Sequence, residues 1–331
     1  MSTPSFPALL QAFFTDRLMQ QRQASPHTVA GYRDTFRLLL AFADTKLHKA
    51  PSTLTFDDLT TAFIGEFLEH LEAKRGNGAR SRNTRLAAIH SFFRFVAFQE
   101  PAVALVCQRI LAMPSKRFVR RAIEYLEPSE IERLLSAPDL TTWIGRRDRA
   151  LLMVAIQTGL RVSELTGLSC RDVILGAGAH VNCQGKGRKE RSTPLRRDTV
   201  AIVDAWLKER AGQPADPLFP NARGGRLSRD AVERLVSKHV RAAEKQCPSL
   251  KRKRVTPHVL RHTAAMELLH HGVDRAVIAL WLGHESIETT QMYLHADLQL
   301  KEEALSHTIP LGQKPGRFRP GDELLTFLES L

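Results

Sequence analysis

The chain has 331 residues, 43% of them hydrophobic and 25% charged, which is typical of a soluble protein with about two domains and sizeable buried cores. It carries 48 Lys and Arg against 35 Asp and Glu, and this net charge of +13 favours a polyanionic partner such as nucleic acid. Neither a signal peptide nor a membrane span is evident, so we expect a cytoplasmic protein.

The first hundred residues have the pattern of a small helical domain. Amphipathic spacing predicts helices at 5–22, 26–43, 51–71 and 81–98. Three arginines lie near the start of the fourth helix: Arg80, Arg82 and Arg85. A solvated basic face and a DNA-binding face explain these charges about equally well.

The next segment, 101–125, changes composition and is predicted to be a basic linker between domains. It contains two prolines and a cluster of four cations: Lys116, Arg117, Arg120 and Arg121. Such charges fit a position beside a phosphate backbone. The four cysteines of the chain form no CxxC pair, so zinc and a disulfide framework are both poor interpretations and reduced thiols are expected.

After a capped helix near residue 128, an apolar helix from Arg147 is predicted to stop at Thr158 and Gly159. A short helix should then begin near Arg161, where Glu164, three residues later, can hold the guanidinium in place. The residues alone favour a weak surface ion pair over a functional arginine.

Three short strands are predicted at 173–175, 180–183 and 191–195, with the run GKGRKE forming a hairpin between the last two. Lys186 would lie at its tip and could reach a phosphate, with Lys189 as the alternative in another register. A P-loop is excluded because Gly187 stands where Ser or Thr is needed.

Helices are predicted at 199–211 and 231–244, before four consecutive cations: Lys251, Arg252, Lys253 and Arg254. Beside a phosphate site, a DNA contact is favoured over a solvated run for these cations. Thr256 and Pro257 then form a helix start that should run to Gly272. His258 and Arg261 lie three residues apart near that start, where a helix favours an anion such as phosphate. His258 and His262 have the spacing of a zinc helix, but Val259 replaces the glutamate of that motif, so a metal site is disfavoured.

Another apolar helical pattern follows and breaks at Gly283, just before His284. Four runs now stand in order: TGLRVSEL (158–165), GKGRKER (185–191), HVLRH (258–262) and LGHESIETTQMYLH (282–295). Together they closely resemble the tyrosine recombinase, or phage integrase, family. By this resemblance Arg161 and Arg261 would be the phosphate arginines, Lys186 the hairpin lysine, His258 and His284 the two histidines, and Tyr293 the nucleophile.

The resemblance implies a mainly α fold with a small antiparallel β-sheet. A four-helix core-binding domain (1–100) and a mixed α/β catalytic domain (126–309) would close around DNA as a clamp. In the core-binding domain the resemblance favours a DNA-binding role for Arg80, Arg82 and Arg85. It implies a site-specific recombinase that works through a 3′-phosphotyrosine intermediate on paired sites in double-stranded DNA. Such an enzyme would act as a homotetramer, or with a related recombinase, and would need no metal or nucleotide cofactor.

Integration, excision or transposition of a mobile element is the favoured role. Chromosome or plasmid dimer resolution, type IB topoisomerase-like relaxation and a silent accessory factor are the alternatives. The end of the chain, 310–331, contains a Pro- and Gly-rich connector and the amphipathic run GDELLTFLESL. That run is expected to dock on a neighbouring protomer, or else to fold back on its own domain.

Overall fold

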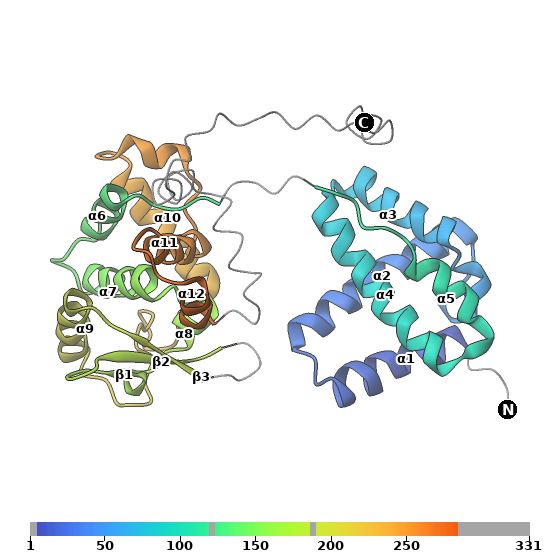
Figure 1. Cartoon of the computed structure of the whole chain (residues 1–331), viewed down its shortest axis with the longest axis horizontal. Helices are drawn as coiled ribbons and strands as arrows, with labels where there is room; N and C mark the ends of the chain where they lie inside the picture. The colour runs from blue at the N-terminus through green and yellow to red at the C-terminus, as the bar shows by residue number, and fades with distance from the viewer. Residues whose placement is uncertain (1–4, 119–122, 186–189, 284–331) are drawn as a thin grey trace, which may run out of the picture. The chain divides into compact units, whose positions relative to one another are not determined.

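The computed structural model describes residues 5–118, 123–185 and 190–283, and the chain divides into two compact units, 1–120 and 121–331 (Figure 1). Both units are mostly helical, and the second contains a three-stranded antiparallel sheet. The mainly α fold class with a small antiparallel sheet is therefore confirmed. Among the described residues no helix is both long and apolar enough to cross a membrane.

The first unit consists of five α-helices. They are α1 (Phe6–Ala12), which continues as a π-helical segment (Phe13–Gln21), α2 (Pro26–Leu47), α3 (Thr61–Arg75), α4 (Ala79–Gln99) and α5 (Ala104–Leu111). The core is rich in phenylalanine, and the Phe92 ring meets those of Phe13 and Phe36 edge to face at 5.4 and 5.2 Å. Such aromatic packing binds α1, α2 and α4 into one bundle.

Two expectations for this unit differ from the structure. Residues 51–71 do not form one helix, because two 3₁₀ turns (Pro51–Thr53 and Phe56–Asp58) come first and α3 begins only at Thr61. The Asp58 carboxylate accepts hydrogen bonds from both the backbone and the hydroxyl of Thr55, which closes the second turn on itself. The Thr60 hydroxyl then caps α3 by accepting from the Phe63 N–H.

The segment expected to be an irregular linker also begins differently. Residues 104–111 form α5, which packs against α4 through Cys107 and Ile110, both fully buried. These two side chains lie three residues apart and therefore share a helical face. The described part of the first unit, 5–118, thus has five α-helices where four helices were expected.

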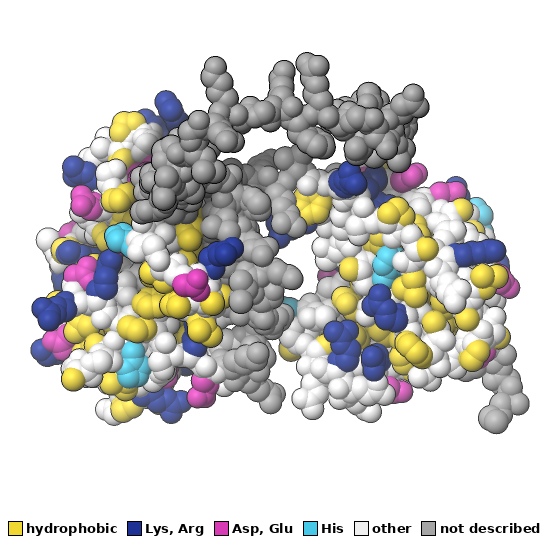
Figure 2. Space-filling view, viewed as in Figure 1, with side chains coloured by type: hydrophobic (Ala, Val, Ile, Leu, Met, Phe, Trp, Pro, Cys, Tyr) yellow, Lys and Arg dark blue, Asp and Glu magenta, His cyan; other side chains and the backbone are white. Residues whose placement is uncertain are grey.

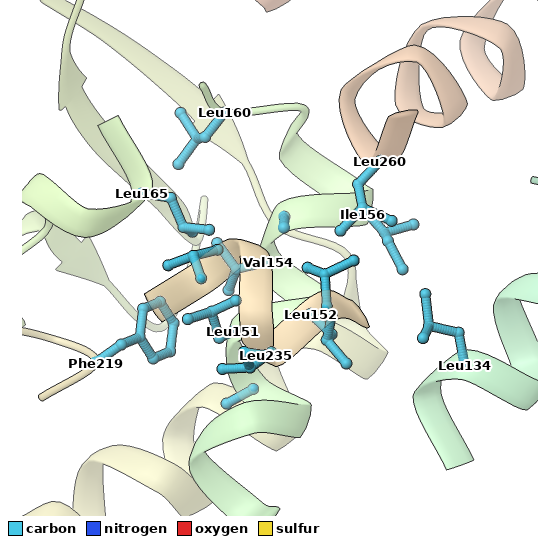
Figure 3. Close-up of a cluster of buried hydrophobic side chains, with 14 of the residues drawn as sticks. Leu134, Leu151, Leu152, Val154, Ile156, Leu160, Leu165, Phe219, Leu235 and Leu260 are labelled. Carbon is cyan, nitrogen blue, oxygen red and sulfur yellow. The ribbon is translucent and has the colours of Figure 1, made fainter. Parts of the chain in front are cut away.

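The second unit is built around α7 (Trp143–Thr158), which packs against α9 (Arg197–Arg210) and α11 (Pro257–His270). Every residue of α7 from Ala150 to Thr158 is buried, and Figure 3 shows its leucines surrounded by side chains from several other elements. The remaining helices are α6 (Pro128–Ser136), α8 (Val162–Gly167), α10 (Arg229–Ala243) and α12 (Arg275–Leu282). Because α7 is so completely buried, the position of its C-terminal end is fixed. Arg161 follows that end by three residues.

The sheet consists of β1 (Val173–Ile174), β2 (His180–Gln184) and β3 (Glu190–Pro194), in the order β1-β2-β3. Its register pairs Val181 with Val173 on one side and with Thr193 on the other, and it pairs Cys183 with Arg191. The three strands were predicted within one or two residues of these limits. Figure 1 shows the sheet at one edge of the unit.

Candidate active site

Arg261 lies in the second turn of α11 and is almost completely buried, with 3% of its surface exposed. Its guanidinium donates to the carbonyl oxygen of Gly159 at 2.6 Å and to that of Leu282 at 2.7 Å. These carbonyls belong to the C-terminal ends of α7 and α12, where helix dipoles favour a cation. Arg261 therefore joins the ends of two helices at one point.

Arg161 reaches the same point from another element. It is the residue before α8, and its Nη2 donates to the carbonyl oxygen of Gly283 at 3.0 Å. The two arginines thus contact consecutive carbonyls, Leu282 and Gly283, although they are a hundred residues apart in sequence. The Arg161 side chain remains 34% exposed, so it can meet a ligand from solvent.

Glu164 holds Arg161, as the i, i+3 spacing predicted, but it is also held by a second arginine. Its Oε1 accepts from Arg161 Nη1 at 2.8 Å, and its Oε2 accepts from the Arg161 backbone N–H at 2.7 Å. Arg191 on β3 donates to both oxygens, at 3.0 and 2.7 Å. Burial would raise the pKa of Glu164, yet the hydrogen bonds from Arg191 and Arg161 outweigh it and hold that pKa below its usual value.

Sequence reasoning did not single out Arg191, although the run GKGRKER ends on it. Its side chain is 12% exposed and faces the buried Glu164. The buried thiol of Cys183, the residue paired with it across the sheet, has its pKa raised by burial to about 11 and so stays protonated at neutral pH. The sequence offered only the position of Arg191 at the end of this run. Its contact with Glu164 could be predicted only if the pairing of β2 with β3 were already known.

Two glycines permit this close approach. Gly159 and Gly283 end α7 and α12 with φ of +63° each, a left-handed conformation that glycine adopts readily. A Cβ on Gly159 would lie 2.6 Å from the Leu282 side chain, and one on Gly283 would lie 2.6 Å from Nη1 of Arg191. Both positions therefore need glycine for space as well as for backbone conformation.

His258 lies in the first turn of α11 and is exposed. Its ring packs against that of His262 with 4.2 Å between centroids. Thr256 caps the helix by accepting from the Val259 N–H, as the sequence predicted. Lys186, the alternative Lys189, His284 and Tyr293 lie outside the described residues. Among the described residues, the structure brings together three of the expected groups: Arg161, Arg261 and Glu164.

The expected DNA-binding cations fall into two groups. Exposed ones are Arg80, Lys116, Arg117, Lys251, Arg252 and Arg254, although Lys116 also pairs with Glu72 at 2.6 Å. Others are held inside their own unit: Arg82 is buried beside Glu72, Arg85 donates to Gly31 and Thr35, and Lys253 donates to Glu130. Arg120 and Arg121 lie outside the described residues. On the face drawn in Figure 2, the Lys and Arg side chains are spread over both units.

Side chains able to hold a metal ion do not cluster in the described part of the chain. Within residues 5–118, 123–185 and 190–283, no three His, Cys, Asp or Glu side chains come together as such a site requires. The groups that do converge are guanidiniums and a carboxylate. Convergent arginines are suited to binding a phosphate in fork geometry.

Comparison with known proteins agrees with this geometry. Residues 124–299, more than half of the chain, match the phage integrase family, and residues 12–100 match its N-terminal SAM-like domain. The integrase/recombinase y4rC of Sinorhizobium fredii is 56% identical over 99% of this chain and 98% of its own length. Tyrosine recombinase XerC of Pelobacter propionicus is 34% identical over 91% of this chain and 95% of its own.

Solved structures show the same fold at lower identity. The Tn1549 transposon integrase in complex with a circular intermediate DNA aligns with a TM-score of 0.69 at 17% identity, over 93% of this chain and 100% of that one. The XerH recombinase bound to its difH substrate aligns with a TM-score of 0.65 at 22% identity, over 91% and 84%. With both family models in place along the sequence, the chain belongs to the phage integrase family and is a tyrosine recombinase, an enzyme that cleaves and rejoins DNA strands.

Proposed function

We propose that this recombinase cleaves double-stranded DNA at paired sites, with Arg161 and Arg261 binding the scissile phosphate and Tyr293 attacking it. The observation that carries the proposal is the convergence of the two guanidiniums on consecutive carbonyls at the end of α12. His284 follows directly in the sequence, and Tyr293 comes nine residues later. The expected histidine and nucleophile therefore follow, in the sequence, the two residues whose carbonyls the arginines contact.

The chemistry follows from the charge of the reaction. Attack on a phosphodiester puts extra negative charge on the nonbridging oxygens, and preorganised arginine donors stabilise it. Tyr293 has a phenol whose ordinary pKa is about 10, so its proton must be removed, and His258 is the proposed base. His284 would donate to the phosphate, and Lys186 would protonate the leaving 5′ oxygen. The 3′-phosphotyrosine link conserves the bond energy, so religation requires no nucleotide.

Double-stranded DNA is the proposed partner. Proteins of the same fold are seen with DNA, among them a λ integrase dimer on a core site and XerH on difH. The net charge of +13 favours the same partner, and the exposed cations of both units can neutralise backbone phosphates. Arg82, Arg85 and Lys253 are left out of this surface because none of them is fully exposed and each is engaged within its unit. We place the reaction in the cytoplasm, on a homotetramer that holds two DNA sites.

Movement of a mobile element, by integration, excision or transposition, is the proposed biological role. It is supported by the 56% identity to a protein named integrase/recombinase. Dimer resolution is the second candidate, because the 34% identity to XerC over 303 residues is also substantial. A plasmid carrying two sites, incubated with a magnesium chelator, separates the reactions: recombinant products support recombination, and relaxed circles alone support topoisomerase-like activity.

The nucleophile is tested by covalent trapping. The enzyme is incubated with duplexes made from the DNA that flanks the gene, and the mixture is then denatured in detergent. DNA that remains covalently attached to protein is sequenced. We expect Tyr293→Phe to abolish attachment while site binding stays nearly intact, because only the attacking oxygen is lost. Tyr32→Phe is the matched control, since Tyr32 stacks on Phe13 inside the first unit. Attachment by the Tyr293→Phe variant would assign the nucleophile to another residue.

A further inference from the structure

We propose that Arg191 is a positioning residue for strand cleavage, which acts through Glu164 to fix the direction of Arg161. The inference rests on the proposed role of Arg161 as a phosphate ligand. Arg191 itself is not a phosphate ligand in this proposal, because its side chain is 12% exposed whereas that of Arg161 is 34% exposed. In this proposal the less exposed arginine positions the more exposed one.

The hydrogen bonds around Glu164 show how the effect is transmitted. Each carboxylate oxygen accepts one bond from Arg161 and one from Arg191, at distances between 2.7 and 3.0 Å. Arg191 presents both terminal nitrogens to the two oxygens, the fork geometry that fixes a carboxylate in one plane. A carboxylate fixed in this way can hold Arg161 in only one orientation. Without Arg191, Glu164 would keep its bonds to Arg161 but lose the partner that orients it.

Charge gives a second reason for Arg191. Arg161 paired with Glu164 alone would be neutral overall, and its attraction for a phosphate would be reduced. Arg191 adds a second positive charge in contact with the buried Glu164 carboxylate. The three groups together carry a net charge of +1, so Arg161 can donate to Glu164 and still attract a dianionic transition state.

Arg191 also links three segments that carry expected catalytic residues. It lies on β3, directly after the hairpin segment whose sequence includes Lys186. It contacts α8 through Glu164, and it passes so close to Gly283 that a Cβ there would lie 2.6 Å from Nη1. Gly283 in turn accepts from Arg161 and precedes His284 in the sequence. A side chain in this position can keep strand, helix and α12 end in a fixed relation.

A purely structural ion pair would give a different pH dependence. The charged and titratable groups around Glu164 are the guanidiniums of Arg161 and Arg191 and the thiol of Cys183. Burial is the largest single influence on the pKa of Glu164 and raises it, and the hydrogen bonds from Arg191 are the largest influence that opposes burial, so removing Arg191 should raise this pKa. A protonated Glu164 holds Arg161 less firmly, so a variant without Arg191 should lose more activity than wild type as the pH falls.

The test compares the rates of single-turnover DNA cleavage by wild type, Arg191→Gln and Arg191→Lys. Cleavage is measured as the covalent protein–DNA product that survives denaturation. We expect Arg191→Gln to slow cleavage ~10- to 100-fold, the scale of a misplaced catalytic group, with site affinity nearly unchanged. Arg191→Lys keeps the charge but not the fork, and should recover part of this loss. The ratio of wild-type to Arg191→Gln rates should grow from about pH 8 to about pH 6. Arg196→Gln is the control, an exposed arginine just beyond β3 that pairs with Glu267.

A double variant, Glu164→Gln with Arg191→Gln, tests the route of the effect. If Arg191 acts through Glu164, the double variant should be no more than ~3-fold slower than the slower single variant. The proposal would be overturned if the rate losses of the two single variants multiplied in the double variant. It would also be overturned if the ratio of wild-type to Arg191→Gln rates did not change with pH, or if Arg191→Gln cleaved at the wild-type rate. Should Arg191→Gln fail to fold, the same criteria apply to Arg191→Lys. Each variant's cleavage rate is expressed relative to that of wild type. The comparison therefore remains valid whichever residue the separate Tyr293→Phe experiment identifies as the nucleophile.

Discussion

The two arginines proposed to bind the phosphate differ in how many structural contacts depend on them. Arg261 is buried and bonded to the ends of α7 and α12, whereas Arg161 is partly exposed at the start of α8. We expect alanine at either position to slow cleavage at least ~100-fold, the scale of losing one transition-state donor. Arg261→Ala should also lower the free energy of unfolding by about 3 kcal/mol, because charged hydrogen bonds to two buried carbonyls are lost.

Urea unfolding followed by tryptophan fluorescence checks the second effect, since all three tryptophans, Trp143, Trp206 and Trp281, belong to the second unit. Arg161→Ala should unfold nearly like wild type in this assay. Equal destabilisation by the two variants would show that the difference in burial does not matter. Cleavage at the wild-type rate by either variant would make that arginine a structural charge only.

Lys186 is tested by a change in the leaving group. If this lysine protonates the departing 5′ oxygen, Lys186→Ala should regain most of its rate on a duplex whose scissile 5′ atom is sulfur, because a thiolate leaves without a proton. The measurement is the ratio of cleavage rates for the sulfur and oxygen substrates in variant and wild type. Without a preferential gain on sulfur, the acid would have to be Lys189 or another group.

The contact between Arg161 and Glu164 could be predicted from sequence, because residues three apart at a helix start meet in nearly any fold. The contact between Arg191 and Glu164 could not, because it joins residues 27 positions apart through a strand register. The burial of Arg82 and the ion pair of Lys253 with Glu130 were missed for the same reason. Their carboxylate partners, Glu72 and Glu130, come from other helices.

At the scale of elements, the turn Pro248–Arg252 is fixed to α6 by a buried carboxylate. Glu130 accepts from Lys253 Nζ at 2.6 Å and from the Ser249 hydroxyl at 2.6 Å, and only 2% of its side chain is exposed. Burial would raise the pKa of Glu130, but the bonds from Lys253 and Ser249 outweigh it and lower that pKa. The stabilisation is therefore present above the unfolded-state pKa and is lost as pH falls through the folded-state pKa.

We expect Glu130→Gln to lower the free energy of unfolding by about 3 kcal/mol at neutral pH, because Lys253 loses its buried partner. The free energy of the variant should also change less than that of wild type as the pH falls from about 5 to about 3. Tryptophan fluorescence in urea gives both values. Glu132→Gln, an exposed position on the same helix, is the control, and parallel pH curves for wild type and Glu130→Gln would contradict the assignment.

Most elements followed from local signals. The end of α7 at Gly159, the start of α11 at Thr256 and the three strands were all predicted, because caps and alternation act within a few residues. The errors lie where two local signals compete. At 51–71 the Thr55 and Asp58 side chains close a separate turn, and at 104–111 an amphipathic helix was hidden among prolines and cations.

At the scale of the whole molecule, each unit has a separate core, one rich in phenylalanine and one centred on α7. The order of the four motifs along the chain was enough to predict the catalytic unit. The sequence alone could not give the convergence of Arg161 and Arg261. That convergence depends on the C-terminal ends of α7 and α12 lying close to the second turn of α11 and to the start of α8.

The last prediction concerns residues 310–331, which lie outside the described residues. The sequence places Leu324, Leu325, Phe327, Leu328 and Leu331 on one helical stripe, and a helix this short is marginal unless the stripe is buried. The connector before it, roughly 10 residues, can span on the order of 30 Å, enough to reach another protomer. We propose that this segment docks on the neighbouring protomer and thereby couples activity to assembly of the tetramer.

Deleting residues 321–331 should leave binding to a single site unchanged, because the proposed phosphate and groove contacts lie elsewhere, but it should weaken pairing of two sites and slow recombination. Native gels with one-site and two-site DNA measure the two steps separately. Replacing Asp322, Glu323 and Glu329 with glutamine is the matched control, since it keeps the apolar stripe and alters only charge. If docking is apolar and between protomers, the control recombines normally and the truncated enzyme fails in a way that higher protein concentration partly restores. Recombination by the truncated enzyme at the wild-type rate would show that the segment folds back on its own domain or serves no coupling role.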